Sequence, residues 1–267
     1  MRAGSLWLVG LGCCLALPFA RAGDAPAARD PVTVKATTGR GDFDVLLYLP
    51  TSAAASIPAA PSPGPCGKPL VLFVSGEGGW RKFDDLVVGF LTQAGYTVAG
   101  VDATKYFWNA QDDRSAAASD FRSIASAAAR AAECPQDASW ILGGFSFGAD
   151  LAPWLAGAGG WNPRPRGLVM IGPDETGSLQ FRYTELLGFQ PTEHIFSVAE
   201  ALKSAAGIPV LIVHGEKDSS SAAPVLAAHA GDPKKLLTIE GANHHFSGRE
   251  EQLRKALVEG IEWVLSY

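Results

Sequence analysis

Apolar residues recur along the chain in short runs that alternate with longer segments of helical spacing. An unbroken apolar run suits a strand that is covered on both faces, so each run predicts a buried, parallel strand. The runs lie at Leu70–Val74, Tyr96–Val101, Trp140–Phe145, Arg166–Ile171, Pro209–Val213 and Leu236–Ile239. The helical segments between and after them lie at Phe83–Ala94, Ser115–Glu133, Ala149–Ala158 and Glu250–Leu265. This alternation predicts an α/β fold with a mostly parallel central sheet and helices on both faces.

The first 69 residues carry a different pattern. Residues 1–22 have a basic start, a short apolar run from Leu6 to Leu17 and a small-residue cleavage site, which predict a secretory signal peptide cut before Gly23. Cys13 and Cys14 leave a lipoprotein as the alternative. Residues 23–69 then predict a tether, an edge hairpin around Gly39–Gly41 and an exposed Ala/Pro-rich loop. Residues 70–267 form the predicted core domain.

Composition narrows the function classes. The chain has 22 basic and 27 acidic residues, and loss of Arg2 and Arg21 with the signal peptide leaves a net charge near −7. This acidity argues against nucleic acid as a partner. No cluster has zinc-like spacing, and no phosphate or dinucleotide fingerprint follows a strand, so we expect neither metal nor cofactor. Residues 172–208 hold no long apolar helical hairpin, so we expect no large lid over the site.

Gly144-Phe145-Ser146-Phe147-Gly148 fits G-x-S-x-G, the pattern of a nucleophile elbow between a strand and a helix. Glycines are needed two residues before and after the serine, because neighbouring backbone approaches closely there. The start of the helix places the Phe147 amide where it can stabilise an oxyanion. The glycine-rich turn Ser75–Trp80 follows another strand and predicts the second donor, the amide of Glu77, with Gly78 as the alternative.

A serine nucleophile needs an imidazole base, and the base needs a carboxylate that orients it. Ser146, Asp218 and His244 occur in the order found in α/β-hydrolases, and each follows a predicted strand, so all three should meet at one edge of the sheet. Asp174 and Glu216 are alternative acids.

Two neighbouring histidines compete for the base: we favour His244, three residues after Gly241, over His245. His194 and His229 are expected on the surface.

Other residues near the predicted site are candidates for substrate binding. Trp80 belongs to the glycine-rich turn, and Tyr106 and Trp108 follow a strand where open α/β sheets bind ligands. Asp150 lies one helical turn after Ser146, and a buried carboxylate there needs a partner. That partner is either a structural arginine or loop amide, or the ammonium group of an aminoacyl substrate.

Several of these segments together resemble the VirJ/AcvB family of bacterial virulence proteins. The resemblance covers about residues 65–265 and rests on the GEGGW turn at 76–80, the YFW stretch at 106–108, the SFGAD elbow at 146–150 and His244-His245-Phe246. It implies a periplasmic protein with the α/β-hydrolase fold, Ser146 as nucleophile and a histidine at 244 or 245 as base.

The resemblance also implies two functions of different classes. One is an esterase that removes the amino acid from aminoacylated phosphatidylglycerol, with transient contact to the membrane surface. The other is a non-catalytic accessory protein of a type IV secretion system. The retained serine, acid and histidine favour the enzyme.

The two cysteines outside the predicted signal peptide are expected to form a disulfide. Cys66 and Cys134 each precede a strand, and in the α/β-hydrolase order those strands are parallel neighbours. The spacing of neighbouring strands is within the reach of a disulfide, and an oxidising periplasm would favour the bond.

Overall fold

The chain folds around an eight-stranded sheet in a computed structural model that describes residues 30–51, 66–181 and 193–267. The predicted signal peptide, most of the tether and residues 52–65 of the Ala/Pro-rich loop lie outside this part. The strand order is β1-β2-β4-β3-β5-β6-β9-β10, and β3 to β10 of this sheet run parallel. The strands are β1 (Val32–Thr38), β2 (Gly41–Tyr48), β3 (Leu70–Val74), β4 (Val98–Val101), β5 (Trp140–Phe145), β6 (Gly167–Ile171), β9 (Val210–Gly215) and β10 (Lys234–Ile239).

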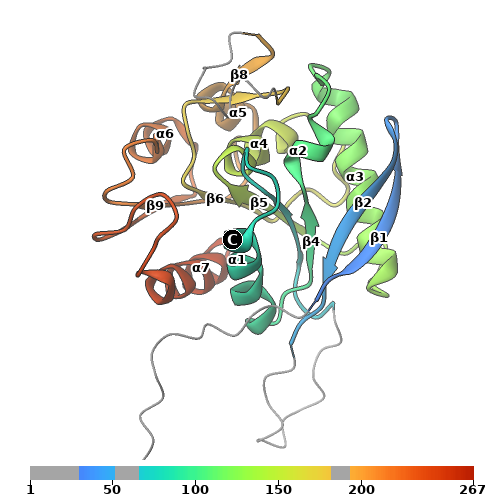
Figure 1. The fold of residues 1–267 in the computed structure, drawn as a ribbon, viewed down its shortest axis with the longest axis horizontal. Coiled ribbons are helices and arrows are strands. Elements are labelled where there is room, and N and C mark those ends of the chain that lie inside the picture. Colours follow the sequence, from blue (N-terminus) through green and yellow to red (C-terminus); the bar gives the residue numbers. More distant parts are fainter. Residues whose placement is uncertain (1–29, 52–65, 182–192) are drawn as a thin grey trace, which may run out of the picture.

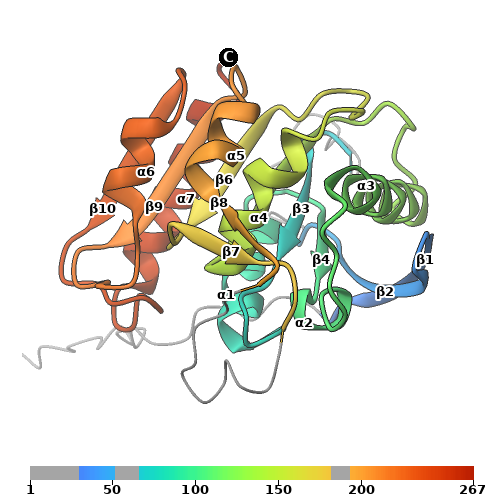
Figure 2. The same cartoon turned by 90° about the horizontal axis from the view of Figure 1, so that it is seen from above.

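Helices cover both faces of the sheet (Figures 1 and 2). One face carries α1 (Lys82–Gln93) and α7 (Glu250–Val264), and the other carries α3 (Arg114–Ala131), α4 (Phe147–Ala156), α5 (Val198–Ser204) and α6 (Ala223–His229). Side chains of the strands pack into two hydrophobic cores, one on each face of the sheet. In β3, Leu70 and Leu72 belong to the core with α3 and α4, whereas Val71 and Phe73 belong to the core with α1 and α7. This double burial explains the unbroken apolar runs and confirms the predicted mostly parallel sheet with helices on both faces.

The predicted edge hairpin is present. β1 pairs with β2 antiparallel around Gly39 and Arg40, and β2 joins the sheet antiparallel to β4. The Gly39 amide donates to Asp120 Oδ1 at 2.6 Å, which attaches the hairpin turn to α3.

Several short elements were not predicted. They are α2 (Ala103–Tyr106), the ribbon β7 (Thr176–Ser178) and β8 (Ile195–Ser197), and helices α5 and α6. None of them exceeds seven residues, about two helical turns, which is too short for apolar spacing to be distinctive, and the ribbon depends on pairing between distant segments. Within the described residues, the ribbon and α5 are the largest elements between β6 and β9, so no lid domain covers the site.

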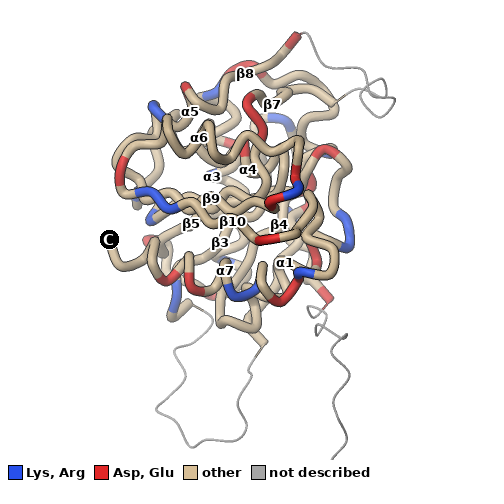
Figure 3. The backbone as a smooth tube through the Cα atoms, turned by 90° about the vertical axis from the view of Figure 1, so that its left-hand side faces the viewer, with Lys and Arg blue, Asp and Glu red and all other residues tan. Residues whose placement is uncertain are grey.

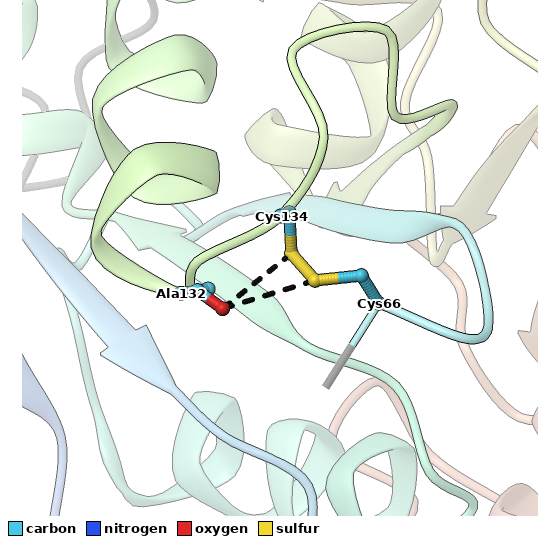
Figure 4. The surroundings of a disulfide bond; sticks show 3 residues. All are labelled: Cys66, Ala132 and Cys134. Carbon is cyan, nitrogen blue, oxygen red and sulfur yellow. Dashed lines mark hydrogen bonds between the residues drawn. A yellow bond between two sulfur atoms is a disulfide. The ribbon is translucent and has the colours of Figure 1, made fainter. Parts of the chain in front are cut away.

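The predicted disulfide is confirmed. Cys66 lies before β3 and Cys134 lies after α3, and their Cα atoms are 5.4 Å apart (Figure 4). Both sulfur atoms approach the carbonyl oxygen of Ala132, at 3.7 and 3.8 Å. The bond joins the segments that enter β3 and β5, at the opposite end of β5 from Ser146. In the described part of the chain, no helix is long and apolar enough to span a membrane.

Candidate active site

Ser146 occupies a sharp turn between β5 and α4. Its backbone has φ 53° and ψ −121°, a left-handed conformation that is rare for a residue with a side chain. A Cβ atom added at Gly144 or at Gly148 would collide with the carbonyl oxygen of Val74. These collisions are the steric reason for both glycines of the G-x-S-x-G pattern. The turn leaves the Ser146 side chain half-buried at the end of the sheet.

Asp218 and His244 lie at the same end, in the loops that follow β9 and β10. Asp218 Oδ2 lies 2.7 Å from His244 Nδ1, and the Asp218 side chain is almost fully buried. Because the carboxylate holds Nδ1, the imidazole is oriented with Nε2 as its remaining ring nitrogen. The Ser146 hydroxyl makes no hydrogen bond with the described residues, so the structure joins Asp218 to His244 but shows no bond from either to Ser146.

A second hydroxyl, which the sequence analysis missed, supports the acid. Ser220 donates to Asp218 Oδ1 through its Oγ at 2.6 Å and through its amide at 3.2 Å. Burial by itself would raise the pKa of Asp218, but the hydrogen bonds from Ser220 and His244 outweigh it and lower the pKa. Asp218 is therefore held as a carboxylate. The only sequence signal for Ser220 is its place two residues after the acid.

Phe145 and Gly172 place the base next to the elbow. The ring centroids of Phe145 and His244 are 4.7 Å apart, and Phe145 is the residue before Ser146. A Cβ atom at Gly172, which has φ +59°, would lie 3.1 Å from His244 Cε1. Glycine at the end of β6 therefore leaves the room that the imidazole occupies.

The competing residues take other positions. His245 stands at an angle to the rings of Phe83 and Phe145, and burial, with the nearby charge of His244, lowers its pKa. Glu216 accepts the Gly241 amide at 2.8 Å and so supports the histidine loop. Asp174 accepts the Glu175 amide. Of the alternatives to the predicted pair, none forms a carboxylate–imidazole contact in the described residues of this edge.

The remaining histidines lie away from the pair. His194 bonds Asp112 at 2.7 Å. His229 is exposed in the last turn of α6.

The glycine-rich turn after β3 borders the elbow. A Cβ atom at Gly76 would lie 3.3 Å from Ser146 Cβ, so the turn passes directly beside the serine. Glu77 and Gly78 are exposed at its tip. On the other side of Ser146, Phe147 contributes the first amide of α4, which has no carbonyl partner within the helix. Two sources of backbone donors thus flank the hydroxyl.

Asp150 lies buried in α4, one turn after Ser146. Its Oδ1 accepts the Asp174 amide at 2.8 Å, so the loop amide foreseen from the sequence is present. Burial, together with the charges of Asp174 and Glu77, raises the pKa of Asp150 well above its ordinary value. Among the described residues no lysine or arginine bonds this carboxyl group.

The structure corrects the prediction for one aromatic residue, Tyr106. Tyr106 is buried in the core under α3, with its hydroxyl donating to Asp120 at 2.7 Å, so it cannot line an open pocket. Trp80 stacks on the ring of Tyr48, and its indole donates a hydrogen bond to Asp85. Its ring lies against Gly100 of β4, and in the strand order β3 separates β4 from β5. Trp108 is 49% exposed, beyond α2. Sequence alone did not show which face each ring takes.

A search of the described residues finds no group of three or more His, Cys, Asp or Glu side chains that could hold a metal ion. The site therefore consists of an elbow serine, an acid–histidine pair and two flanking amide sources, all at the carboxyl ends of the parallel strands.

Comparison with known proteins gives a family and a fold. The family described as bacterial virulence protein (VirJ) matches residues 68–264. The esterase domain of a Rhodothermus marinus protein is similar, with a TM-score of 0.60 and 18% identity over 90% of this chain and 99% of that one. A dienelactone hydrolase from Anabaena variabilis has a TM-score of 0.60 and 18% identity over 86% and 97%.

A third similar structure is an α/β serine hydrolase without a lid from Xanthomonas campestris. Its TM-score is 0.55, with 18% identity over 87% of this chain and 94% of that one. These likenesses show the α/β-hydrolase fold. A search of the curated proteins finds no match.

Proposed function

The chain belongs to the VirJ family of bacterial virulence proteins, and from this premise we propose that it is a serine ester hydrolase that cleaves aminoacylated phosphatidylglycerol in the periplasm. The observation that carries the proposal is the strained Ser146 elbow at the same sheet edge as the Asp218–His244 pair. A binding surface would need neither the strain nor the buried pair.

The proposed reaction has two halves. Ser146 Oγ attacks the ester carbonyl carbon while His244 Nε2 accepts its proton, and the amides of Phe147 and Glu77 stabilise the oxyanion. Collapse of this intermediate releases the lipid hydroxyl, which takes the proton from His244. A water molecule then gives a proton to His244 and attacks the acyl-enzyme carbonyl carbon. Ser146 Oγ leaves, takes that proton back from His244 and releases the amino acid, which regenerates both residues. Asp218 stabilises the charged imidazole in both halves.

Carboxyl groups near the elbow support an aminoacyl substrate. Asp150 lies one helical turn from Ser146, and the charges of Asp174 and Glu77 act on it. Asp150 is 2% exposed, so the α-ammonium of an aminoacyl ester would act on it through its electrostatic field and not by direct contact. Since the described residues supply no lysine or arginine to Asp150, that field would favour the ionised carboxylate. Neutral acyl esters lack this interaction.

The proposed location rests on two observations. The Cys66–Cys134 bond suits an oxidising compartment, and residues 1–22 have the pattern of a signal peptide. The protein would meet its lipid at the membrane surface transiently.

A pair of matched substrates tests the proposal. The purified chain is incubated with vesicles that contain alanyl- or lysyl-phosphatidylglycerol, and the free amino acid is measured. We expect release by the wild type and none by Ser146→Ala. The wild type should hydrolyse the N-acetylated forms of the same lipids more slowly than the free amines. Asp150→Asn should lower this rate ratio by at least about tenfold.

Other outcomes would reject the proposal at different levels. Equal hydrolysis of free and N-acetylated esters would reject ammonium recognition but keep the hydrolase. If no ester is cleaved and a fluorophosphonate does not label Ser146, the hydrolase itself is wrong, and the accessory secretion role becomes the better hypothesis.

A further inference from the structure

The outer side of α3 borders two adjoining cavities that the proposed reaction does not use. One, of about 360 Å³, lies between α3 and the loop after α4, with Trp161 and Pro163 in its wall. The other, of about 450 Å³, extends to the edge strand β1. Arg122, Ser126 and Arg130 line both, so we treat the two as one α3 groove.

The charge of the α3 groove is opposite to that of the chain. The described residues that line it include Lys35, Arg122 and Arg130 and no carboxylate, although acidic residues outnumber basic ones by 27 to 22 in the chain. By contrast, charges of both signs are interspersed over the face formed by α6, α7 and β10 (Figure 3). The groove is therefore a local concentration of positive charge, which attracts anions.

The two arginines have donors left for a ligand. Arg122 donates through Nη1 to the Gly159 carbonyl at 3.0 Å, which leaves the rest of its guanidinium unused by the described residues. The guanidinium of Arg130 makes no hydrogen bond or ion pair with the described part of the chain. Lys35 bonds Asp44 at 2.7 Å and adds a partly neutralised charge.

Local structure keeps the α3 groove open and holds Arg122 in place. Residues 119, 122, 123, 126 and 130 share one helical face, where serines fill the positions between the arginines and leave space. Gly160 has φ +71°, and a Cβ atom there would lie 3.0 Å from Arg122 Nη1. The Trp161 indole donates to the Leu155 carbonyl at 3.1 Å, which orients its ring in the wall.

We propose that the α3 groove binds a phosphoryl group of a small molecule or lipid headgroup, a role separate from ester hydrolysis. Guanidinium groups match the oxygens of a phosphate in paired hydrogen bonds, and the serine hydroxyls add further donors. Arg122 and Arg130 are eight residues apart, about 12 Å along the helix, so long side chains from both ends of the groove converge over Ser126. Trp161 offers an apolar wall for the rest of the ligand.

Pyrophosphate is a suitable probe, and titration calorimetry at constant ionic strength measures its affinity. We expect the double variant Arg122→Gln/Arg130→Gln to bind at least about tenfold more weakly than the wild type. The control is Arg254→Gln, which removes an arginine that pairs with Glu251 on α7 and should leave the affinity unchanged. Hydrolysis of p-nitrophenyl esters should be the same in all these chains, because the groove lies at the far end of β5 from Ser146.

The source of the phosphoryl group is distinguished with glycerol 1-phosphate and with vesicles of phosphatidylglycerol or phosphatidylcholine. Binding to phosphatidylglycerol vesicles that the double variant loses would indicate a lipid headgroup. Binding of glycerol 1-phosphate without vesicle binding would indicate a soluble phosphate ester. The proposal is overturned if the wild type does not bind pyrophosphate, or if the double variant and the Arg254→Gln control lose the same affinity.

Discussion

The two ends of strand β5 differ in backbone, charge and covalent structure. At the carboxyl end, Ser146 has a strained backbone and Asp150 and Asp218 are buried acids. At the amino end, near Trp140, the Cys66–Cys134 bond joins two chain segments and the α3 groove is basic. The difference teaches that backbone strain with buried carboxyl groups and covalent reinforcement lie at opposite ends of one strand. Mutations should therefore separate activity from stability.

The largest effect should come from the reactive end. Ser146→Ala should lower kcat for p-nitrophenyl esters by about 10³-fold or more, because the hydroxyl forms the covalent bond. Circular dichroism should show an unchanged fold, since the side chain makes no hydrogen bond with the described residues. Near-normal activity of this variant would contradict the assignment of Ser146 as the nucleophile.

The neighbouring residues His244 and His245 provide a matched pair of variants for the same assay. His244→Ala should be nearly as inactive as Ser146→Ala, because His244 alone of the two bonds Asp218. His245→Ala should retain most of its activity. The reverse result would move the base to His245.

At the opposite end, removal of the disulfide should affect stability and not chemistry. Cys66→Ser/Cys134→Ser opens a loop with a sequence separation of 68 residues, and chain entropy predicts a loss of roughly 4 kcal/mol in the free energy of unfolding. Urea denaturation measures this loss, and ester hydrolysis of the folded variant should match the wild type. Two alkylatable thiols in unreduced wild-type protein from the periplasm would contradict the bond.

Asp84, in the first turn of α1, tests whether a buried carboxyl group lowers the free energy of unfolding when it ionises. Burial raises its pKa to about 7; its Oδ2 accepts the Arg81 amide at 2.7 Å, and its Oδ1 is unpaired within the described structure. Between pH 4 and 7 the folded state then holds a proton that the unfolded state has lost. The free energy of unfolding should therefore fall as pH rises through this window, by up to about 1.4 kcal/mol per pH unit.

The matched variant is Asp84→Asn, which keeps an oxygen for the Arg81 amide and cannot ionise. Its stability, measured by urea denaturation at pH 5, 6 and 7, should change less with pH than that of the wild type. Identical slopes for the two proteins would exclude Asp84 as the group responsible.

The smallest effect is expected at Ser220, whose hydroxyl lies 2.6 Å from Asp218 Oδ1 but 3.4 Å from His244 Nδ1. Ser220→Ala removes the 2.6 Å hydrogen bond to Asp218 but keeps the amide bond, so kcat/KM should fall by less than about tenfold. Ser221→Ala is the control, because Ser221 bonds the Pro173 carbonyl instead. A larger loss in Ser221→Ala than in Ser220→Ala would reject this role for Ser220.

The sequence predicted those features that follow from a residue pattern or from the strand order of a known fold. Strands such as β3 and β5 are apolar throughout because both faces are buried, and Gly144 and Gly148 are needed because Val74 lies against the elbow. The Cys66–Cys134 bond followed from strand order. These inferences needed the residue pattern, the strand order of the α/β-hydrolase fold and the general geometry of parallel sheets.

Other features depend on distant partners and could not be predicted. Tyr106 is drawn into the core by Asp120 of α3 and by the packing of Phe43 of β2. Ser220 acquires a role only because Asp218 turns toward it. Apolar spacing does not indicate which face a ring in a one-turn helix takes, nor which hydroxyl meets a carboxylate.

The φ of 53° at Ser146 has a consequence for how this chain can evolve. Glycine adopts this conformation without steric strain, so the backbone at this position favours glycine over serine, and only a role of the hydroxyl offsets that preference. A lineage that kept the fold for binding alone would be free to exchange Ser146 for glycine. The residue at the position of Ser146 should therefore distinguish relatives that hydrolyse esters, which keep serine, from relatives that only bind, which can have glycine.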